Sequence, residues 1–397
     1  MNKSRLWTKN FIINTIINFL IFLGYYSLMV VIAVYAIDQL KATPSQAGLA
    51  AGIFIVAALF SRILTGRAIE QVGRKKMLYI GLMVFSIATV LYFKVTYFPF
   101  FIIVRIIHGI GFGISTTSTA TIIANIIPQD RRGEGIGFYS LSVTLGSAIG
   151  PLIGMNLYQY VSFQAILILC VALLVVIFVQ SIFLKIPKAE LTVEQLDDMK
   201  RLTLNNFFEF KVLPIAIVAT LVYFSYSSII GFLSIYTKEI NLVGAGSFFF
   251  MVYSLSILIS RPLIGRLFDS KGENFVMYPS FVLFAIGLVI LSQAHQGVIL
   301  LLSAVFLGIG FGTFASSGQT IAIKVSPAHR MGLATSTFLA IAEMGIGLGP
   351  YFLGLLIPVM GFRMLYLTMA IIAIIAMFGY YFVHGRKVKN GVTPLVD

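Results

Sequence analysis

Long apolar segments alternate with short polar breaks along the whole chain. Breaks at charged residues, prolines and turn residues leave twelve apolar segments, and about 20 apolar residues suffice for a helix to cross a bilayer. Their approximate extents are 11–37, 45–69, 76–94, 98–126, 133–158, 162–184, 212–237, 245–268, 275–294, 297–325, 331–358 and 362–384. The first runs past Tyr35, too long for the apolar region of a cleavable signal. The pattern predicts an all-α integral membrane protein with twelve transmembrane helices.

One stretch departs from this pattern. Residues 185–211 are charged and compatible with a helix, and they separate six predicted spans from the six that follow. We interpret this stretch as a cytoplasmic linker. It divides the chain into an amino-terminal half, residues 1–184, and a carboxy-terminal half, residues 212–397.

Composition supports a membrane protein and excludes several other classes. The 397 residues are 59% hydrophobic and 11% charged, whereas soluble domains carry about 25% charged residues. The net charge of +14 does not indicate nucleic-acid binding, because no soluble basic module is present to carry it. The one cysteine, Cys170, excludes an intrachain disulfide and a cysteine metal cluster. We expect no metal site and no cofactor.

The basic residues predict how the chain is oriented. With both termini in the cytoplasm, 21 of the 28 Lys and Arg residues fall on the cytoplasmic side, four fall outside, and three lie within or at the ends of spans. Lys and Arg concentrate in cytoplasmic loops, so this orientation is favoured over its inverse. We expect a multi-pass protein of the cell membrane, in a bacterium the cytoplasmic membrane.

The second half repeats the first at a fixed distance of 199 residues. The stretch SRILTGRAIEQVG begins at Ser61 and SRPLIGRLFDSKG at Ser260, and GIGFG occupies residues 109–113 and again 308–312. Because each copy holds an even number of spans, both copies insert the same way up. The repeat predicts two parallel six-helix halves related by an axis along the membrane normal, with a substrate site between them near the midplane.

This architecture resembles the major facilitator superfamily, and three local patterns carry the same resemblance. GRAIEQVGRKK, residues 66–76, is similar to the family's signature loop G-x-L-a-D-R-x-G-R-K, with Glu70 where Asp is usual and Gln71 where a basic residue is usual. RIIHGIGFG, residues 105–113, is similar to the fourth-span motif with its buried arginine. GSAIGPLIG, residues 146–154, is similar to the fifth-span motif of the drug:proton antiporter branch, which accompanies exporters in this family.

The resemblance implies a cytoplasmic gate at the first of these patterns. In the family, ion pairs at this loop hold the outward-facing state closed, and we expect glycines to permit its tight turn. The candidate gate residues are Gly66, Glu70, Gly73, Arg74 and Lys75 in the first copy and Gly265, Arg266, Asp269 and Gly272 in the second. The second copy has Glu273 and Asn274 where the first has Arg74 and Lys75, so we expect a weaker gate there. A role in membrane topology alone is the alternative for the basic residues.

The fifth-span motif spaces its glycines four residues apart, which lets another helix pack closely. Its residues are Gly146, Gly150, Pro151 and Gly154, and the second copy keeps Gly345, Gly349 and Pro350. Leu353 stands at the third glycine position of the second copy. Surrounding helices can satisfy the carbonyl group that a proline frees. We predict a close-packed hinge in each half.

Of the fourteen acidic residues, Glu343 is the one placed deep in a predicted span. A carboxylate at the bilayer centre costs about 2.5 kcal/mol or more, so we expect it to face a cavity or a partner. At about 100° per residue, it lies away from the face that carries Gly345 and Gly349. We predict that Glu343 carries protons, binds a cationic group of the cargo, or both. A carboxyl group held by Ser or Thr for packing alone is the alternative.

Arg105 and His108 stand three residues apart in the fourth span, on one helix face. Arg105 is a candidate partner of a coupled acid or of an anionic group of the cargo, and a structural hydrogen-bonding role between helices is the alternative. His108 is a candidate proton relay because histidine titrates near neutral pH. A satisfied core residue is the alternative for His108, and it is the commoner role of a lone histidine in a span.

The first and seventh spans line the cavity in proteins of this fold. The aromatic residues in these spans are therefore candidates for contact with the cargo, although packing or lipid contact is the alternative for each one. The cavity candidates are Tyr25, Tyr26, Tyr223 and Tyr226.

These patterns favour a proton-coupled exporter, an antiporter of small amphipathic or cationic molecules of the multidrug type, working by alternating access as a monomer. Its partners would be the substrate, protons and the lipid bilayer. A dedicated exporter of a cellular metabolite, such as a zwitterionic opine-like metallophore, is the alternative, and an importer of a small solute is a further one. No metal-ligand spacing, G-x-S-x-G or P-loop occurs, so we predict neither an enzyme nor a primary pump. The fold does not settle the cargo.

Overall fold

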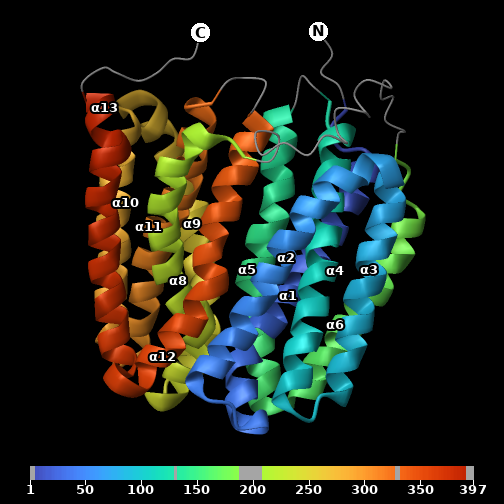
Figure 1. Ribbon diagram of the computed structural model, residues 1–397, viewed down its shortest axis with the longest axis horizontal. Coiled ribbons are helices and arrows are strands. Elements are labelled where there is room, and N and C mark those ends of the chain that lie inside the picture. The colour runs from blue at the N-terminus through green and yellow to red at the C-terminus, as the bar shows by residue number, and fades with distance from the viewer. Residues whose placement is uncertain (1–4, 129–131, 187–207, 327–330, 390–397) are drawn as a thin grey trace. The chain divides into compact units, whose positions relative to one another are not determined.

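The computed structural model describes residues 5–128, 132–186, 208–326 and 331–389, and over these ranges the chain is helical apart from short connections (Figure 1). The helices before the predicted linker are α1 (Lys9–Leu40), α2 (Pro44–Val72), α3 (Arg74–Leu91), η1 (Tyr92–Lys94), α4 (Phe98–Ile126), α5 (Arg132–Tyr160) and α6 (Phe163–Ile182). Those after it are η4 (Phe210–Val212), α8 (Leu213–Glu239), α9 (Val243–Lys271), α10 (Glu273–Ser292), α11 (Gly297–Lys324), α12 (Met331–Tyr380), η6 (Tyr381–Gly385) and α13 (Arg386–Lys389).

The predicted membrane spans are confirmed as helices. Among the described residues, eleven helices are long and apolar enough to cross a membrane. The longest, α12, runs through a kink at Gly361, whose φ of 70° and ψ of 173° are not helical. This kink separates the two segments that the sequence predicts as spans 331–358 and 362–384. The protein is therefore a multi-pass membrane protein.

Local sequence fixes several of the helix ends. The Thr8 hydroxyl accepts a hydrogen bond from the Phe11 amide at 3.2 Å, and the Ser162 hydroxyl accepts one from the Ala165 amide at 3.2 Å. Such caps satisfy amides that have no partner inside the helix. Helix α1 ends at Leu40, and the next residue, Lys41, has a left-handed φ of 55°. These signals are local, which is why the sequence locates many helix ends to within a few residues.

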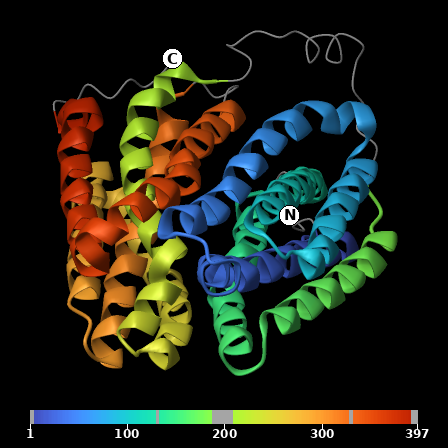
Figure 2. The ribbon, with the colours of Figure 1, turned by 60° about the horizontal axis from the view of Figure 1, so that its bottom comes forward.

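Contacts divide the chain into two compact units. The first holds Met1–Lys41 and Ile53–Arg201, and the second holds Ala42–Gly52 and Leu202–Asp397. In the first unit α1 packs against α5 and α6, and α3 packs against α4; in the second, α8 packs against α12 and α10 against α11. The first turns of α2 therefore group with the second unit, although α2 is one continuous helix (Figure 2). Most of the predicted linker lies outside the described residues.

The sequence repeat is also a repeat of packing. A Cβ atom added to Gly109 would lie 2.3 Å from the carbonyl oxygen of Phe54, and one added to Gly308 would lie 2.4 Å from that of Tyr253. Both the glycines and their partners are 199 residues apart. Each copy of GIGFG thus brings two helix backbones together at the same position of its own unit, where only a residue without a side chain fits.

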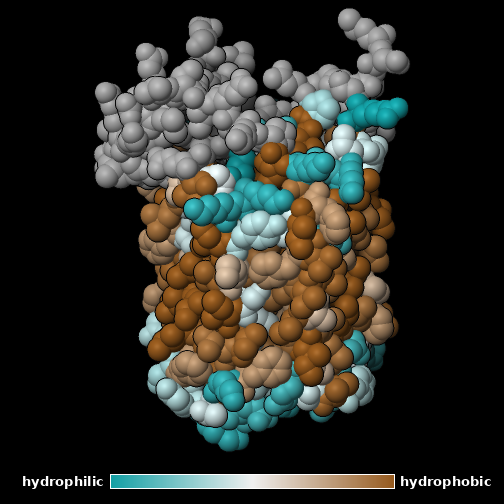
Figure 3. Space-filling view, turned by 90° about the vertical axis from the view of Figure 1, so that its right-hand side faces the viewer, coloured by the Kyte–Doolittle hydropathy of each residue, from teal (hydrophilic) through white to brown (hydrophobic). Residues whose placement is uncertain are grey.

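An apolar band covers the outer face of α3 and α6, with polar residues gathered toward both ends (Figure 3). Exposed residues in these helices include Met83, Ile87, Val175 and Val179. Soluble monomers rarely expose apolar patches of more than a few hundred Å². We interpret this face as the one that contacts lipid.

Candidate functional site

Arg105 is buried on α4 inside the first unit, with 1% of its surface exposed. Its guanidinium carbon lies 4.5 Å from the ring centre of Phe54, a cation–π contact. Nη1 donates to the Tyr92 hydroxyl oxygen at 3.4 Å, and Nη2 lies 3.5 Å from the sulfur of Met29. The contacts come from α1, α2 and η1, so Arg105 ties several helices of the unit together.

His108 has a hydroxyl group at each ring nitrogen. The Tyr92 hydroxyl lies 3.3 Å from Nδ1, and Thr89 Oγ1 lies 3.4 Å from Nε2. Thr89 donates its one proton to the Phe85 carbonyl at 2.8 Å, so its oxygen accepts from Nε2–H. Tyr92 accepts from Arg105 and has its own proton left for Nδ1.

This chain of donors and acceptors is complete when His108 is neutral and carries its proton on Nε2. The ring also stacks on Phe85, with centroids 4.3 Å apart and planes 8° apart. A second proton would take the acceptor away from Tyr92 and put a cation beside buried Arg105. The geometry therefore supports the satisfied core role for His108, and the proton relay stays a prediction.

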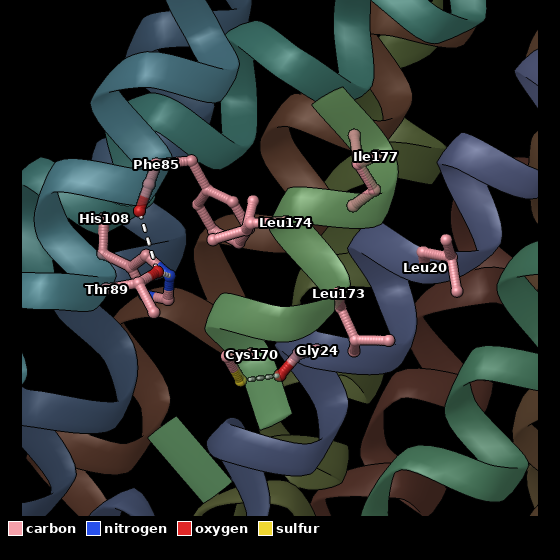
Figure 4. Close-up of a pocket in the computed structure, with 9 residues that line it drawn as sticks. All are labelled: Leu20, Gly24, Phe85, Thr89, His108, Cys170, Leu173, Leu174 and Ile177. Atoms are coloured by element: carbon pink, nitrogen blue, oxygen red, sulfur yellow. Dashed lines mark hydrogen bonds between the residues drawn. The ribbon is translucent and has the colours of Figure 1, made fainter. Parts of the chain in front are cut away.

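A small cavity of about 10 Å³ opens beside His108 (Figure 4). It is lined by Leu20, Gly24, Phe85, Thr89, His108, Cys170, Leu173, Leu174 and Ile177. That volume corresponds to about one water molecule, whereas pockets for drug-sized ligands measure about 300 Å³ or more. This cavity therefore has room for a water molecule but not for a cargo.

Aromatic rings surround the tyrosines that the sequence singles out in the first unit. Tyr25 stacks on Phe54, with centroids 5.1 Å apart, and on Phe112, with centroids 4.6 Å apart. Tyr26 lies 4.8 Å from Tyr25, ring centre to ring centre. Tyr25 is thus held in a ring stack built from α1, α2 and α4.

The second unit has the corresponding stack. Tyr226 stacks on Phe311 at 3.9 Å and on Tyr253 at 5.7 Å, and the Tyr223 ring lies 5.0 Å from Phe311. Tyr253 and Phe311 stand 199 residues after the two phenylalanines that hold Tyr25. Sequence reasoning found the tyrosines and missed their partners, although the repeat register could have identified them.

The fifth-span glycine stripe packs on α1. A Cβ on Gly154 would lie 2.0 Å from the Ser27 carbonyl oxygen. At Gly150 and Gly146 the nearest atoms would be the Cβ atoms of Tyr26, at 2.7 Å, and Phe22, at 2.9 Å. Pro151 lies inside α5 and the helix continues past it. The close-packed face expected at this motif is present, and α1 is its partner.

The second copy packs on α8 in the same way. A Cβ on Gly345 would lie 2.5 Å from the Thr220 carbonyl oxygen, and one on Gly349 would lie 2.1 Å from Ser227 Oγ. The Thr220 hydroxyl also donates to the Ile341 carbonyl at 3.0 Å. With that face of α12 against α8, the partly exposed Glu343 lies about 120–160° around the helix from these glycines.

A further small-residue contact within the second unit was not expected from the sequence. A Cβ on Gly52 of α2 would lie 1.8 Å from the Gly347 carbonyl oxygen, and one on Gly48 would lie 1.9 Å from that of Pro350. Helix α12 therefore uses two faces for close approach. The sequence signal was available, since Gly48 and Gly52 are four residues apart.

The candidate gate loop is tighter than expected. Gly73 alone separates α2 from α3, with φ of 95°, and Gly272 alone separates α9 from α10, with φ of 85°. The expectation that Gly66 also serves the turn is wrong, because it lies inside α2, and an added Cβ would meet nothing within 4 Å. Gly265 is equally open inside α9.

Of the charged gate candidates, Arg74 opens α3 directly after Gly73. Lys75 Nζ donates to the carbonyl oxygens of Ile182, at 3.2 Å, and Leu184, at 2.9 Å. Lys75 therefore holds the end of α6 within its own unit. The side chains of Glu70, Arg266 and Asp269 lie outside the described residues.

A buried polar network joins α1, α4 and α5 in the first unit, and sequence reasoning missed it. Thr119 Oγ1 donates to Asn18 Oδ1 at 3.0 Å, Asn18 Nδ2 donates to Ser142 Oγ at 2.7 Å, and Asn14 Nδ2 donates to the Thr119 carbonyl at 2.9 Å. Polar residues in an apolar span were the available signal. Within the described residues no group of three or more His, Cys, Asp or Glu side chains could hold a metal ion.

A family model, described as Major Facilitator Superfamily, matches residues 15–292 and 215–395. An uncharacterized MFS-type transporter of Methanocaldococcus jannaschii is 25% identical over 383 residues, covering 92% of this chain and 96% of that protein. The staphylopine export protein of Staphylococcus aureus is 26% identical over 362 residues, covering 85% and 87%. The quinolone resistance protein NorA of the same species is 29% identical over 136 residues, covering 34% and 35%.

Solved structures share the fold. A bacterial homologue of the human lysosomal transporter Spinster, in an inward-facing and unoccupied conformation, has a TM-score of 0.80 at 15% identity, covering 99% of this chain and 100% of that one. The nucleoside transporter NupG has a TM-score of 0.76 at 18% identity, covering 95% and 99%. The chain belongs to the Major Facilitator Superfamily and is a membrane transporter, not an enzyme.

Proposed function

We propose that this protein is a proton-coupled exporter of a small molecule, working by alternating access. The observation that carries the proposal is the Gly-Pro motif of α5, whose glycines pack on the backbone of α1, with a second copy in α12 packed on α8. Such a paired, close-packed hinge suits helices that shift as rigid bodies. The resemblance of this motif to the antiporter branch, and exporters among the relatives, support outward transport.

Two cargo classes remain candidates, and one observation favours each. Small amphipathic or cationic molecules, of the kind a multidrug exporter carries, fit the antiporter-type motif and the match to NorA. A dedicated zwitterionic metabolite fits the match to the staphylopine export protein, which extends over 85% of this chain where that to NorA extends over 34%.

The charges suit a cargo in either class that has a cationic group. In the second unit, Glu343 lies away from the face of α12 that packs on α8, and it is the candidate for binding a cation or a proton. In the first unit, Arg105 is held by Phe54 and Tyr92 and is the candidate partner of an anionic group. Transport of a lipophilic cation would depend on Glu343, whereas transport of a zwitterion would depend on Arg105 as well.

Transport in proteoliposomes with an imposed pH gradient tests the coupling. A pH-sensitive dye inside the vesicles reports proton movement when cargo is added, with Glu343→Gln compared with wild type. Glutamine keeps the shape and cannot carry a proton, so we expect cargo-driven proton movement to be lost. The matched control is Glu239→Gln, which alters an exposed acid at the end of α8 and should leave coupling intact. Coupling in Glu343→Gln equal to wild type would remove the role assigned to Glu343.

A panel of lipophilic cations and zwitterionic metabolites in the same vesicles separates the two cargo classes. Substitution Arg105→Gln sharpens the comparison, because it should weaken zwitterion transport more than transport of a lipophilic cation. Uptake driven by an inward proton gradient would contradict export.

We also propose that the protein works as a monomer in the cytoplasmic membrane of a bacterium. Both termini would lie in the cytoplasm, because this orientation puts most of the basic residues on the cytoplasmic side.

A further inference from the structure

A buried ionic cluster lies where α10 begins, at the end of the second unit that carries the carboxyl terminus of the described chain. Glu273 is 5% exposed, and its two carboxylate oxygens have different partners. Oε1 lies 3.2 Å from Nζ of Lys324, the last residue of α11, and Oε2 accepts from Nε2 of His384 in η6. One carboxylate thus joins three helices at their ends.

The next residue, Asn274, strengthens the same junction. Its amide nitrogen donates to the Gly385 carbonyl at 2.9 Å, and its amide oxygen accepts from the Tyr380 hydroxyl at 2.9 Å. The segment that Asn274 and Glu273 hold, η6, is a π-helical turn. Such turns are rare and are often found at functional sites.

The first unit has the same attachment made with different chemistry. Glu273 and Asn274 stand 199 residues after Arg74 and Lys75, and both pairs follow a glycine with positive φ. Lys75 donates to two carbonyl oxygens at the end of α6. In each unit, therefore, the residues that open the third span hold the end of the sixth. The second unit replaces this lysine by a carboxylate, an amide and a histidine.

This replacement makes the second attachment sensitive to protonation. An ionised carboxylate only accepts hydrogen bonds, so His384 donates to it in either charge state, but a charge-assisted bond is about twice as strong as a neutral one. Histidine is also the side chain that ordinarily titrates near neutral pH. When His384 is neutral, Lys324 does not replace the lost charge at Glu273 Oε2. Lys324 pairs with the other carboxylate oxygen, Oε1, and the Lys324 side chain is half exposed.

No second acid competes for His384 among the described groups of the elements that pack against η6. These groups are Glu273, Asn274 and Tyr278 of α10, Lys324 of α11, Tyr380 of α12, and Arg386 and Lys387 of α13. The charged residues of α8, Lys238 and Glu239, lie in its last turn, whereas the end of α12 approaches α8 near its first turns, where a Cβ on Gly379 would lie 3.5 Å from Val218. Tyr380 is neutral and lies beside the histidine, with ring centroids 5.7 Å apart. Glu273 is therefore the group whose pairing follows the charge of His384.

We propose that Glu273 and His384 form a protonation-sensitive clamp that fixes the end of the last span on α10, tight when His384 is protonated and loosened when it is neutral. The clamp is separate from cargo coupling. It works through the position of η6 and α13, and it needs neither Glu343 nor Arg105. The inference is accordingly independent of the proposed function.

Spin-label mobility across a pH range tests the clamp in the full-length protein. A nitroxide on Lys387→Cys reports on α13, where position 387 is exposed, and the native Cys170 is buried and does not compete for the label. Between pH 5.5 and 8.5 we expect the mobile fraction to rise about fivefold, which corresponds to about 1 kcal/mol lost when a charged hydrogen bond becomes neutral. The matched control is a label on Lys185→Cys at the end of α6, where Lys75 makes the attachment, and its mobility should not depend on pH.

Two substitutions separate the clamp from general loosening. His384→Gln can still donate to Glu273 but does not titrate, so mobility at position 387 should lose its pH dependence. His295→Gln, at an exposed histidine of the same unit, should keep it. Glu273→Gln should leave the segment mobile at every pH. A wild-type spectrum that does not change with pH, or an unchanged pH response in His384→Gln, would overturn the proposal, and neither result requires the Glu273 variant to fold.

Discussion

Substitution Gly154→Ala should destabilise the first unit because α5 and α1 meet there backbone to backbone. The added Cβ would lie 2.0 Å from the Ser27 carbonyl oxygen, 2.8 Å from its carbon and 3.0 Å from its Cα. Ordinary contacts of a Cβ begin at 3.4 Å, so the two helices must separate by about 1.4 Å. None of the three atoms belongs to a flexible side chain that could move away.

The magnitude follows from two opposing effects. Overpacking a tight interface costs about 1–3 kcal/mol and occasionally more, and separating two backbones falls at the upper end of that range. Replacing Gly by Ala in a helix gains about 1 kcal/mol in propensity. The net destabilisation should therefore be about 2 kcal/mol, and smaller for Gly146→Ala, where the nearest atom is a side-chain Cβ at 2.9 Å.

Thermal unfolding in detergent measures this effect, and proteoliposome transport shows whether close packing at this motif is needed for activity. The control is Gly24→Ala on α1, where an added Cβ would meet only side chains, at 3.7 and 3.8 Å. Gly24→Ala should match or exceed wild-type stability, whereas Gly154→Ala should melt several degrees lower and transport more slowly. Equal melting temperatures and equal transport rates for the two variants would contradict the claim that close packing at Gly154 is needed for stability and transport.

Other predictions concern the histidine chain and the gate turn. Tyr92→Phe removes the hydroxyl that joins Arg105 to His108 and leaves two buried groups short of a partner, so stability should fall by about 1–3 kcal/mol in a denaturation series. Gly73→Ala should cost about 1–3 kcal/mol because φ is 95° there. Gly66→Ala, seven residues earlier in the same loop motif, should instead gain about 0.5–1 kcal/mol, because it adds a methyl group to an open helix face. Equal melting temperatures for the two glycine variants would contradict this assignment of the turn.

Several features of the site could be read from the sequence because they depend on one helix at a time. The glycine spacing of the fifth span predicts a close-packed face, and the phase of α12 puts Glu343 on another face than Gly345 and Gly349. The buried position of Arg105 follows from its motif. The partners of these residues could not be read in the same way. Nothing in the spacing of α4 points to Tyr92, whose hydroxyl decides the proton position on His108.

The Glu273–His384 pair is a second contact whose partner could not be read from the sequence. From the sequence alone, the loss of the basic pair after Gly272 predicts a weaker gate, since Glu273 and Asn274 replace Arg74 and Lys75. The structure brings Glu273 against a residue 111 positions later, and no local pattern links the two. The repeat register was the available guide, because it aligns this position with one that already holds the end of a span.

The sequence by itself determined the membrane architecture, the repeat and the position of nearly every span, because bilayer thickness and helix periodicity act on consecutive residues. Even the break at Gly361 inside α12 was visible in it. The tertiary structure alone decided which helix faces meet, that α1 receives the stripe of α5, and that α12 uses two faces. Such contacts depend on the rotation and crossing of helices that are far apart in the chain. Rotating a helix about its axis by one residue position would change every partner on its surface.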